Sequence, residues 1–405
     1  MWTLGIDWAE KHLDYCLLTP SGDVSIRGRV DNNETGFSHM LAECTQQANE
    51  PQSISAAIES AHQPVVNFLI ARQITVYPVN PTAIFDYRKS VKGSGSKSDT
   101  ADAELIARYL REHYRKLRAW HLPEPQLRQL QLLVEDRDKV VTEKVRLQNQ
   151  LRSTLLGYFP QAALAFSNLS SKAALDFLSQ FPTPESLQAQ SHLEWQTFLD
   201  DHRIFHKKAR QRFLTALKQV PMTVDTHVVS AKSLLTEILV CQLRKLTTAL
   251  VTYQERIDEL LNGFDDSSRF KSLPGIDTIV AAKLLVHIGT DRQRFATANE
   301  LQTFFGTAPY TKSSGQSKSV HFRRACHKGM RTALQQMALS SLRKSQWAKA
   351  YFDKKRKEGK KGSHAMRCLA NLWLKVIFAI WKTKKVYSED KHLAAVARHQ
   401  ISQPI

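Results

Sequence analysis

The chain has 405 residues, enough for two or three domains that each bury a core, and its 57 Lys+Arg against 38 Asp+Glu give a formal net charge of +19. With 42% apolar and 23% charged residues, the composition excludes a collagenous or wholly disordered chain, and no apolar run is long enough to predict a transmembrane helix. The five scattered cysteines argue against a disulfide framework or a structural zinc site, and the N-terminus has no basic leader, so we expect a cytoplasmic protein.

The positive charge is concentrated at the C-terminal end. Residues 1–100 carry 8 Lys+Arg and 11 Asp+Glu, a net charge of −3, whereas residues 301–405 carry 22 and 4, a net charge of +18. A region this basic is expected to bind a polyanion, because neutralising phosphates releases their condensed counterions. Nucleic acid is favoured over a membrane surface, since the same region contains apolar helical stretches typical of a core.

The first 118 residues alternate between strands and helices. We expect strands at 3–8, 13–19, 24–30, 53–59 and 74–79, and helices at 33–48, 64–72 and from 98 or 99 to about 114. A loop of Gly, Ser and Lys at 91–98 precedes the last helix. The order β-β-β-α-β-α-β-α predicts an α/β domain of the RNase H-like type, with its first three strands in an antiparallel meander.

The rest of the chain is predicted to be mainly helical. Residues 126–156 and 225–261 have the apolar period of long helices and are long enough for a coiled-coil arm, while residues 160–222 between them have no predicted role. The last domain opens at 273–282 with a Pro-Gly turn that is either helix-hairpin-helix-like, and able to hold a phosphate, or an ordinary helix–helix turn. Helices are expected near 295–306, 330–344 and 365–381, and residues 307–324 are expected to form a loop rich in Ser, Lys and Arg.

Four carboxylates are candidates for one metal site in the first domain. Asp7 ends the first strand and Glu59 the fourth, and these strands are neighbours in an RNase H-like sheet. Asp99 and Asp102 lie three residues apart at the start of a helix and so share a face, although each alone could be a helix cap or a first-turn acid. Clustered carboxylates repel one another unless a cation neutralises them, and hard oxygen ligands favour Mg²⁺ or Mn²⁺.

These acids, with several motifs further along, resemble the DEDD transposases of bridge-RNA-guided insertion sequences, which are related to site-specific DNA invertases. The resemblance covers most of the chain. The stretches that carry it are Gly5-Ile6-Asp7, Ile58-Glu59, Lys97-Ser98-Asp99-Thr100-Ala101-Asp102-Ala103, Leu273-Pro274-Gly275-Ile276, Gly306-Thr307-Ala308-Pro309 and Ser314-Gly315.

The resemblance implies a RuvC-like domain at 1–118, a helical coiled-coil arm at 119–265 and a basic C-terminal transposase domain at 266–405. It implies that Asp7, Glu59, Asp99 and Asp102 hold Mg²⁺ or Mn²⁺ and that Ser314 attacks DNA. The expected partners are donor and target DNA, a structured non-coding guide RNA, and further copies of the chain in a homodimer or tetramer, in the cytoplasm with the nucleoid and not at a membrane.

Basic residues around the candidate serine are expected to bind nucleic acid. Ser313 and Ser317 are chemically equivalent to Ser314, so only the motif register selects Ser314, and a flexible Ser/Gly loop is the alternative. Tyr310 and Trp347 could stack on bases or pack in a core. The predicted nucleic-acid contacts are Lys97, Lys312, Lys318, Arg323, Arg324, Lys328, Arg331, Lys354, Lys355, Arg356 and Lys357.

The sequence therefore predicts an RNA-guided DNA transposase that cuts and exchanges strands through a covalent phosphoserine. Two alternatives remain open. The first is a RuvC-like Holliday-junction endonuclease that uses metal-activated water, and the second is a nucleic-acid-binding scaffold without catalysis.

Overall fold

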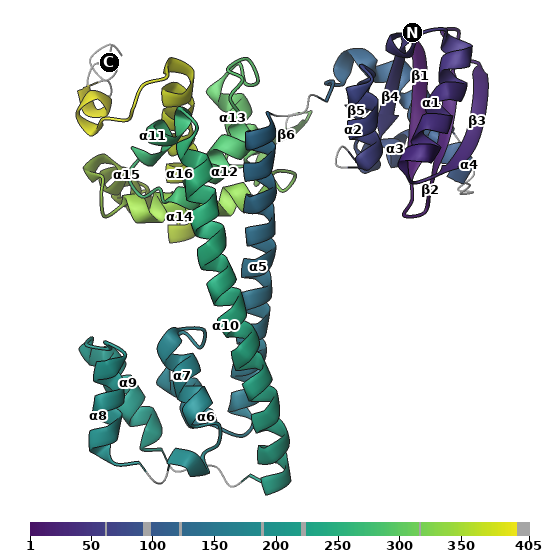
Figure 1. Ribbon diagram of the computed structural model, residues 1–405. Coiled ribbons are helices and arrows are strands. Elements are labelled where there is room, and N and C mark those ends of the chain that lie inside the picture. The colour runs from purple at the N-terminus through teal and green to yellow at the C-terminus, as the bar shows by residue number, and fades with distance from the viewer. Residues whose placement is uncertain are drawn as a thin grey trace. The chain divides into compact units, whose positions relative to one another are not determined.

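The computed structural model describes residues 1–60, 63–91, 99–120, 124–187, 190–219, 224–315 and 317–394, with the side chains of 99–101 outside the description (Figure 1). The chain forms two compact units, Met1–Pro123 and Glu124–Ile405. The first unit is mixed α/β and the second is mostly helical.

The first unit is built on a five-stranded sheet. Its strands are β1 (Trp2–Trp8), β2 (His12–Leu18), β3 (Val24–Asp31), β4 (Ile54–Ile58) and β5 (Thr75–Pro78), in the order β3-β2-β1-β4-β5. The first three strands pair antiparallel, which confirms the predicted meander, and β4 and β5 continue the sheet in parallel with β1.

Helices cover both faces of this sheet. On one face, α1 (Glu34–Ala48) and α2 (Pro64–Ala71) pack on the alternate residues of β1 that include Leu4 and Ile6. On the other face, α4 (Asp99–His113) packs on residues of β2 and β4. The helix α3 (Pro81–Val91) was not predicted, because Ile84 is its one buried residue and its apolar period is correspondingly weak. Short 3₁₀ turns occupy Pro51–Ser53 and Tyr114–Lys116.

Two long helices form the axis of the second unit. They are α5 (Pro125–Leu156) and α10 (Thr226–Asn262), which lie side by side as the periodicity predicts (Figure 1). The start of α5 shares a core with the end of α10, and the end of α5 shares another with the start of α10. The pair is therefore antiparallel and carries a separate hydrophobic core at each end.

The segment between these helices folds into a small helical subdomain. It comprises α6 (Pro160–Ala165), α7 (Lys172–Gln180), a 3₁₀ turn at Glu185–Leu187, α8 (His192–Asp201) and α9 (Lys207–Leu217). Its core is rich in aromatic rings, with Phe177 and Phe213 fully buried at a centroid separation of 5.6 Å. The described part of the segment 160–222, for which the sequence predicted no role, thus shares a hydrophobic core with the helix pair.

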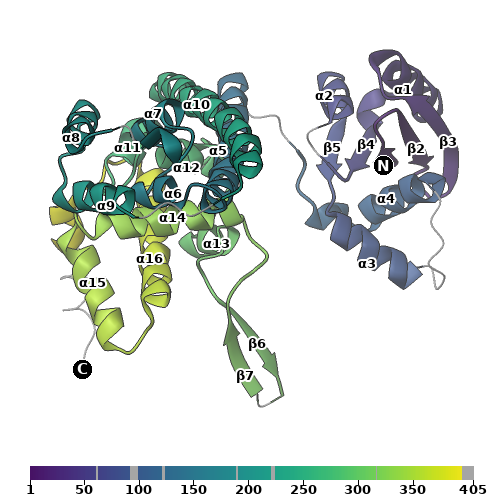
Figure 2. The same cartoon turned by 90° about the horizontal axis from the view of Figure 1, so that it is seen from below.

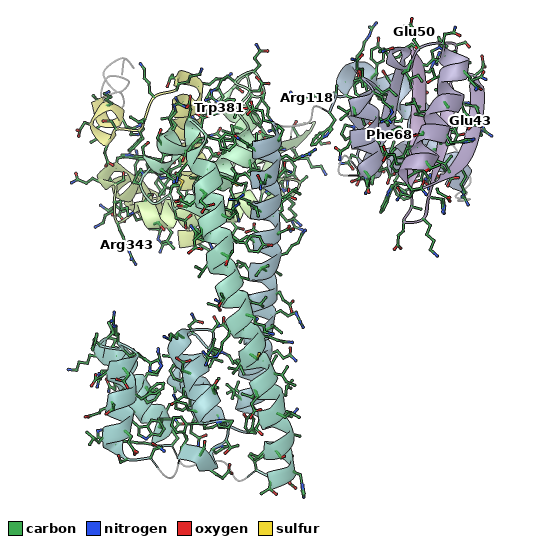
Figure 3. All side chains as sticks on the ribbon, viewed as in Figure 1. Glu43, Glu50, Phe68, Arg118, Arg343 and Trp381 are labelled. Atoms are coloured by element: carbon green, nitrogen blue, oxygen red, sulfur yellow. The ribbon has the colours of Figure 1, made fainter. Side chains whose placement is uncertain are left out.

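The opposite end of the helix pair is completed by the C-terminal helices. These are α11 (Asp266–Lys271), α12 (Thr278–Ile288), α13 (Ala298–Phe304), α14 (Lys328–Ser341), α15 (Gln346–Lys357) and α16 (Gly362–Thr383). Trp381, labelled in Figure 3, is fully buried here and its Nε1 donates a hydrogen bond to the Gly289 carbonyl at 2.9 Å. None of the described helices combines the length and hydropathy that a membrane span requires.

The prediction of a loop at 307–324 was wrong for most of that segment. It contains a two-stranded antiparallel hairpin of β6 (Tyr310–Ser314) and β7 (Ser317–His321), which extends away from the helices of its unit (Figure 2). Every strand residue is exposed, so the strands lack the alternation of apolar and polar residues from which a half-buried strand is predicted.

The contact between β1 and α4 leads to a stability test. A Cβ at Gly5 would lie 2.0 Å from the Ala103 carbonyl oxygen and 2.5 Å from the Ala107 nitrogen, both of which are backbone atoms. We expect Gly5→Ala to lower the free energy of unfolding of the first unit by about 1–3 kcal/mol or more, because the helix must move off the sheet. Denaturant unfolding of the full chain measures this.

Gly157→Ala is the matched control. That position follows α5 in a right-handed conformation with φ −83°, and its added Cβ would lie at 3.4 Å from the nearest atom. The control should unfold like the wild type. Equal midpoints for Gly5→Ala and Gly157→Ala would refute the tight helix–sheet contact.

Candidate active site

Asp7 and Glu59 lie at the same edge of the sheet. Ile6 of β1 pairs with Ile58 of the parallel strand β4, and each acid is the next residue along its strand direction. The expectation that the two strands are neighbours is confirmed. Asp7 is half-buried and Glu59 exposed, and each makes interactions within the protein.

The first turn of α4 lies toward this edge. Gly5 packs under Ala103 and Ala107, and at the other end of the helix the Arg111 guanidinium donates to the Ser21 carbonyl at 2.6 Å, in the turn that follows β2. The end of β2 pairs with the start of β1, so α4 runs antiparallel to β1. Because Asp7 lies two residues beyond Gly5 on the same face of β1, the beginning of α4 approaches it.

Asp102 is held by an arginine in the structure. Its Oδ1 lies 2.6 Å from an Arg88 guanidinium nitrogen of α3, and the two side chains are only 16% and 19% exposed. Arg88 is a residue that the sequence analysis missed, since nothing in the pattern of α3 links it to the acids. The predicted residues Lys97 and the side chain of Asp99 lie outside the described part of the chain.

The donor chemistry at this edge suits a hard divalent cation, although the described groups are not gathered around one point. Asp7, Glu59 and Asp102 offer only carboxylate oxygens, the ligands that Mg²⁺ and Mn²⁺ prefer. Among the described side chains, no group of three His, Cys, Asp or Glu residues is close enough to hold a metal ion. Arg88 neutralises Asp102 in this arrangement, so a cation would have to compete with the guanidinium.

Ser314 lies at the tip of the exposed hairpin. Tyr310 pairs with His321, Lys312 with Ser319, and Ser314 with Ser317, so these six residues share one face of the hairpin. Ser313, Lys318 and Val320 belong to the opposite face. The strand register thus places Ser314 and Ser313 on opposite faces of the hairpin and leaves Ser317 beside Ser314. Gly315 follows in the left-handed region with φ +55°.

The root of the hairpin is fastened to the helices. The Thr307 hydroxyl donates to the Asn371 side chain of α16 at 2.7 Å, and the Arg331 guanidinium of α14 donates to the Arg323 carbonyl at 2.8 Å. Gly306 has φ +68°, and a Cβ there would lie 2.2 Å from Cys326 Sγ, so the two ends of the hairpin meet where only glycine fits. Arg331, a predicted nucleic-acid contact, therefore has a structural partner inside the protein.

The surroundings of the hairpin are strongly basic. The sequence holds no Asp or Glu between Glu300 and Asp353. Within the described residues, no ion pair is found for the remaining predicted contacts of this segment, which are Lys312, Lys318, Arg323, Arg324 and Lys328. Their charges are available to phosphate groups.

Two histidines of the same unit, His287 and His327, do not add to this charge. Burial lowers the pKa of His287 to about 3 and also lowers the pKa of His327, whose ring centroid lies 4.1 Å away. The Nδ1 atom of His327 accepts a hydrogen bond from the Met330 nitrogen at 3.0 Å, as a neutral imidazole can. The cationic surface is thus made of lysines and arginines.

The second basic cluster lies at the end of α15. The last turn of this helix contains Lys354, Lys355, Arg356 and Lys357, where the helix dipole favours cations. Lys355 is partly neutralised by Glu358 at 2.8 Å. The other three side chains are not paired with a carboxylate in the part of the chain that the structure describes, which leaves a basic surface.

Trp347 and the Pro-Gly turn of the last domain contribute to its packing and helix capping. Trp347 packs on Trp373 with centroids 4.5 Å apart and donates to the Tyr387 hydroxyl at 2.8 Å, so of its two predicted roles the structure shows core packing. At the Pro-Gly turn, the Asp277 side chain caps α12 by accepting from the Val280 nitrogen at 2.8 Å. Because a carboxylate already occupies this helix start, the structure favours the ordinary helix–helix turn over a phosphate site.

Comparisons with known proteins match both halves of this arrangement. A family model described as a transposase, that of the DEDD transposases of IS110, matches residues 4–160. A second, described as the transposase IS116/IS110/IS902 family, matches residues 267–353. Together these matches span more than half of the chain and contain the four acids and Ser314.

Full-length relatives support the same assignment. The chain is 26% identical to a Streptomyces coelicolor protein described as "Mini-circle putative transposase for IS117", over 96% of each chain. It is 26% identical to a 42 kDa protein of insertion element IS900 from Mycobacterium paratuberculosis, over 96% of this chain and 98% of the relative. It is 24% identical to a 44.8 kDa protein of IS116 from Streptomyces clavuligerus, over 95% and 96%.

The Arg88–Asp102 ion pair generates a test of the metal hypothesis. We expect Arg88→Gln to tighten Mn²⁺ binding several-fold, because the cation no longer displaces a mostly buried guanidinium, a step that costs about 1 kcal/mol or more. Titration of the full chain with Mn²⁺, followed by electron paramagnetic resonance of the free ion, measures the affinity.

Arg72→Gln is the control, since that guanidinium lies over the Phe68 ring in the same unit, 3.5 Å from its centroid. It removes the same charge without touching Asp102. Equal Mn²⁺ affinities for the two variants would show that Arg88 does not compete with a cation for Asp102.

Proposed function

This chain is a transposase of the IS110/IS116 family, and we propose that it cuts and exchanges DNA strands through a covalent phosphoserine formed at Ser314, guided by a structured non-coding RNA. The observation that carries the proposal is the placement of Ser314. It lies at the exposed tip of a hairpin that projects from a basic domain, inside the family's second matched region.

The chemistry at the serine conserves the energy of the phosphodiester bond. The Ser314 Oγ attacks a DNA phosphorus, a bond from Oγ to phosphorus forms, and the bond to one deoxyribose oxygen breaks. The serine proton is lost to a base or solvent, and the leaving oxygen takes up a proton to become a hydroxyl. Attack on the phosphoserine by a hydroxyl of another strand reverses these steps and joins the new pair, so no external energy source is needed.

The basic side chains around the hairpin orient the DNA for this attack. Lys312 lies on the same face as Ser314, two residues away, and can contact a neighbouring phosphate. Arg323 and Arg324 follow the second strand and can contact phosphates of the same DNA farther from the serine. An exposed tip gives a bulky duplex access to the hydroxyl.

We further propose that the first unit is an RNase H-like, RuvC-like domain whose acids hold Mg²⁺ or Mn²⁺. The sheet order and the shared edge of Asp7, Glu59 and the start of α4 support this assignment. The ligands would be Asp7, Glu59, Asp99 and Asp102, and a bound divalent cation would activate a nucleophile or stabilise a leaving oxygen in phosphodiester chemistry.

The proposed assembly is a homodimer or tetramer with donor DNA, target DNA and guide RNA, acting in the bacterial cytoplasm at the nucleoid. The net charge of +18 at residues 301–405 supports more than one nucleic-acid partner. Strand exchange requires two duplexes to be held together, which supports more than one copy of the chain.

The serine is tested by trapping on a suicide DNA substrate with Mg²⁺ and the RNA that co-purifies with the protein. We expect a covalent protein–DNA adduct on denaturing gels for the wild type and for Ser313→Ala and Ser317→Ala, and none for Ser314→Ala. Ser313 is a stringent control because it is the adjacent hydroxyl on the opposite face.

The other results separate the alternatives. An adduct that is lost in Ser317→Ala but kept in Ser314→Ala would identify Ser317 as the nucleophile. Hydrolytic nicking that survives Ser314→Ala would indicate the junction endonuclease. If no cleavage occurred with all components present, the result would support the alternative of a nucleic-acid-binding scaffold without catalysis.

The carboxylates are tested separately by Asp7→Asn, Glu59→Gln and Asp102→Asn. Each should lower the rate of strand exchange roughly 100-fold or more, because a metal supplies several kcal/mol of transition-state stabilisation. Asp86→Asn, an exposed acid on α3, should keep full activity. Chelation should abolish wild-type exchange and Mg²⁺ should restore it; full activity in all three variants would exclude the metal site.

A further inference from the structure

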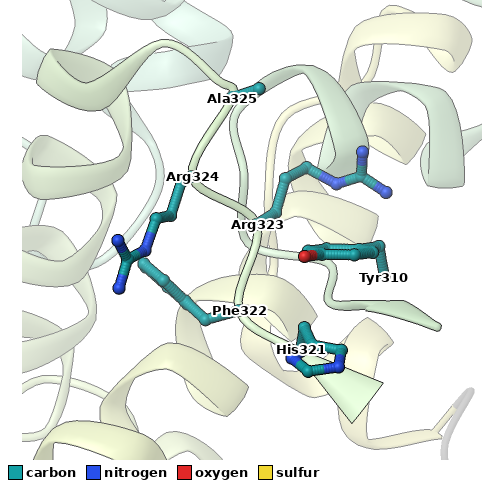
Figure 4. A pocket seen from close by; sticks show the side chains of 6 residues that line it. All are labelled: Tyr310, His321, Phe322, Arg323, Arg324 and Ala325. Atoms are coloured by element: carbon teal, nitrogen blue, oxygen red, sulfur yellow. The ribbon is translucent and has the colours of Figure 1, made fainter. Parts of the chain in front are cut away.

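A pocket at the root of the hairpin has no role in the chemistry described so far. It has a volume of about 770 Å³ and is lined by Tyr310, His321, Phe322, Arg323, Arg324 and Ala325 (Figure 4). Three of these side chains are aromatic and two are guanidinium groups. In Figure 4, Tyr310 and Arg323 lie along one side of the pocket and Arg324 and Phe322 along the other.

The aromatic rings are arranged for stacking. Tyr310 and His321 face one another across the two strands, with ring centroids 5.4 Å apart and an interplanar angle of 26°. The Tyr310 residue is 42% exposed, so its ring retains an accessible surface. The Arg323 guanidinium lies 5.9 Å from the Tyr310 ring centroid, which places a cation beside the stack.

The pocket walls are held in place by the helices. Phe322 lies under two guanidinium groups, Arg331 of α14 at 4.4 Å and Arg367 of α16 at 4.8 Å from its ring centroid. The Arg323 Nε approaches the Ala308 carbonyl at 3.4 Å, and Arg331 donates to the Arg323 carbonyl. The site is therefore supported from its own strands and from two helices, and needs no partner to form.

A single chemical class matches these walls, namely an unpaired nucleotide. A flat base finds a ring to stack on, and the phosphates on either side of it find Arg323 and Arg324, with no acid of this segment to repel them. A peptide with acidic side chains would satisfy the arginines but would leave the Tyr310–His321 stack without a flat partner.

We propose that this pocket takes an unpaired base of the DNA strand that Ser314 attacks. The inference rests on the proposed function for the identity of that strand. Tyr310, Lys312 and Ser314 alternate along one face of β6, which places the stacking ring about 13 Å from the serine at 3.3 Å per residue. That length corresponds to about four nucleotides at a stacked spacing of about 3.4 Å each. One strand can thus meet the ring, the lysine and the serine in succession.

The test is a double-mutant cycle between the ring and the bases. Binding of the full chain is measured to a short oligodeoxyuridylate and to an abasic oligomer of the same length, for the wild type and for Tyr310→Ala. For the wild type, removal of the bases should weaken binding roughly 5- to 150-fold, since stacking contributes about 1–3 kcal/mol per base. In Tyr310→Ala the same removal should have little further effect, whereas Tyr310→Phe should behave like the wild type.

Val320→Ala is the matched control, because Val320 is 69% exposed on the opposite face of the same hairpin. It should leave both affinities unchanged. The pocket proposal would be overturned if Tyr310→Ala and base removal weakened binding independently of each other. It would also be overturned if Val320→Ala weakened binding as much as Tyr310→Ala does. Oligouridylate provides the second arm: tighter binding of this RNA than of oligodeoxyuridylate, with the same coupling to Tyr310, would overturn the assignment to DNA.

The outcome is separable from that of the serine test. A phosphoserine adduct without coupling between Tyr310 and the bases would keep the transposase function and reject the pocket. Coupling without any adduct would support a nucleotide pocket but reject Ser314 as the nucleophile. The proposal that the bound strand is the one that Ser314 attacks would then also be rejected.

Discussion

The antiparallel packing of α5 against α10 is the constraint on which the second unit depends. At one end it supplies apolar side chains such as Leu130 and Ile257 to the core of the C-terminal helices, and at the other it supplies Leu151 and Val240 to the aromatic subdomain. The C-terminal helices in turn hold the root of the hairpin through Asn371 and Arg331. The position of Ser314 within its unit is thus traceable to the packing of two long helices.

Charge is distributed differently in the two regions that carry the candidate chemistry. The described acids at the sheet edge all have interactions within the protein, and Asp102 has a guanidinium partner. Around the hairpin, most of the described cations have no carboxylate partner, because the local sequence contains none. The first region is electrostatically compensated by its own arginine, whereas the second has no carboxylate nearby in sequence to compensate it. This contrast agrees with a protein whose polyanionic partner lies against the C-terminal domain.

Much of the architecture could be predicted from the sequence, because strong periodicity survives in a single chain. The strands β1 to β5 and the helices α5 and α10 have apolar patterns that match their burial, and the neighbouring positions of β1 and β4 followed from the predicted RNase H-like order. The helix α3 and the hairpin escaped prediction because each buries almost nothing: one has a single buried residue and the other has none. Arg88 could not be predicted because its contact with Asp102 joins two helices whose packing is a tertiary property. The choice of Ser314 over Ser313, and the role of Ser314, rest on the family resemblance, while the strand register adds that the two serines lie on opposite faces.

The two cores on the helix pair have a further consequence for how this chain tolerates change. At 1.5 Å per residue, the 32 residues of α5 span about 48 Å, so the cores at its ends have no side chains in common. Substitutions in the aromatic subdomain and in the C-terminal core should therefore have additive effects on stability. Additivity makes the second unit divisible. A change in the distal subdomain should alter the stability of that subdomain and leave the core that carries the hairpin intact.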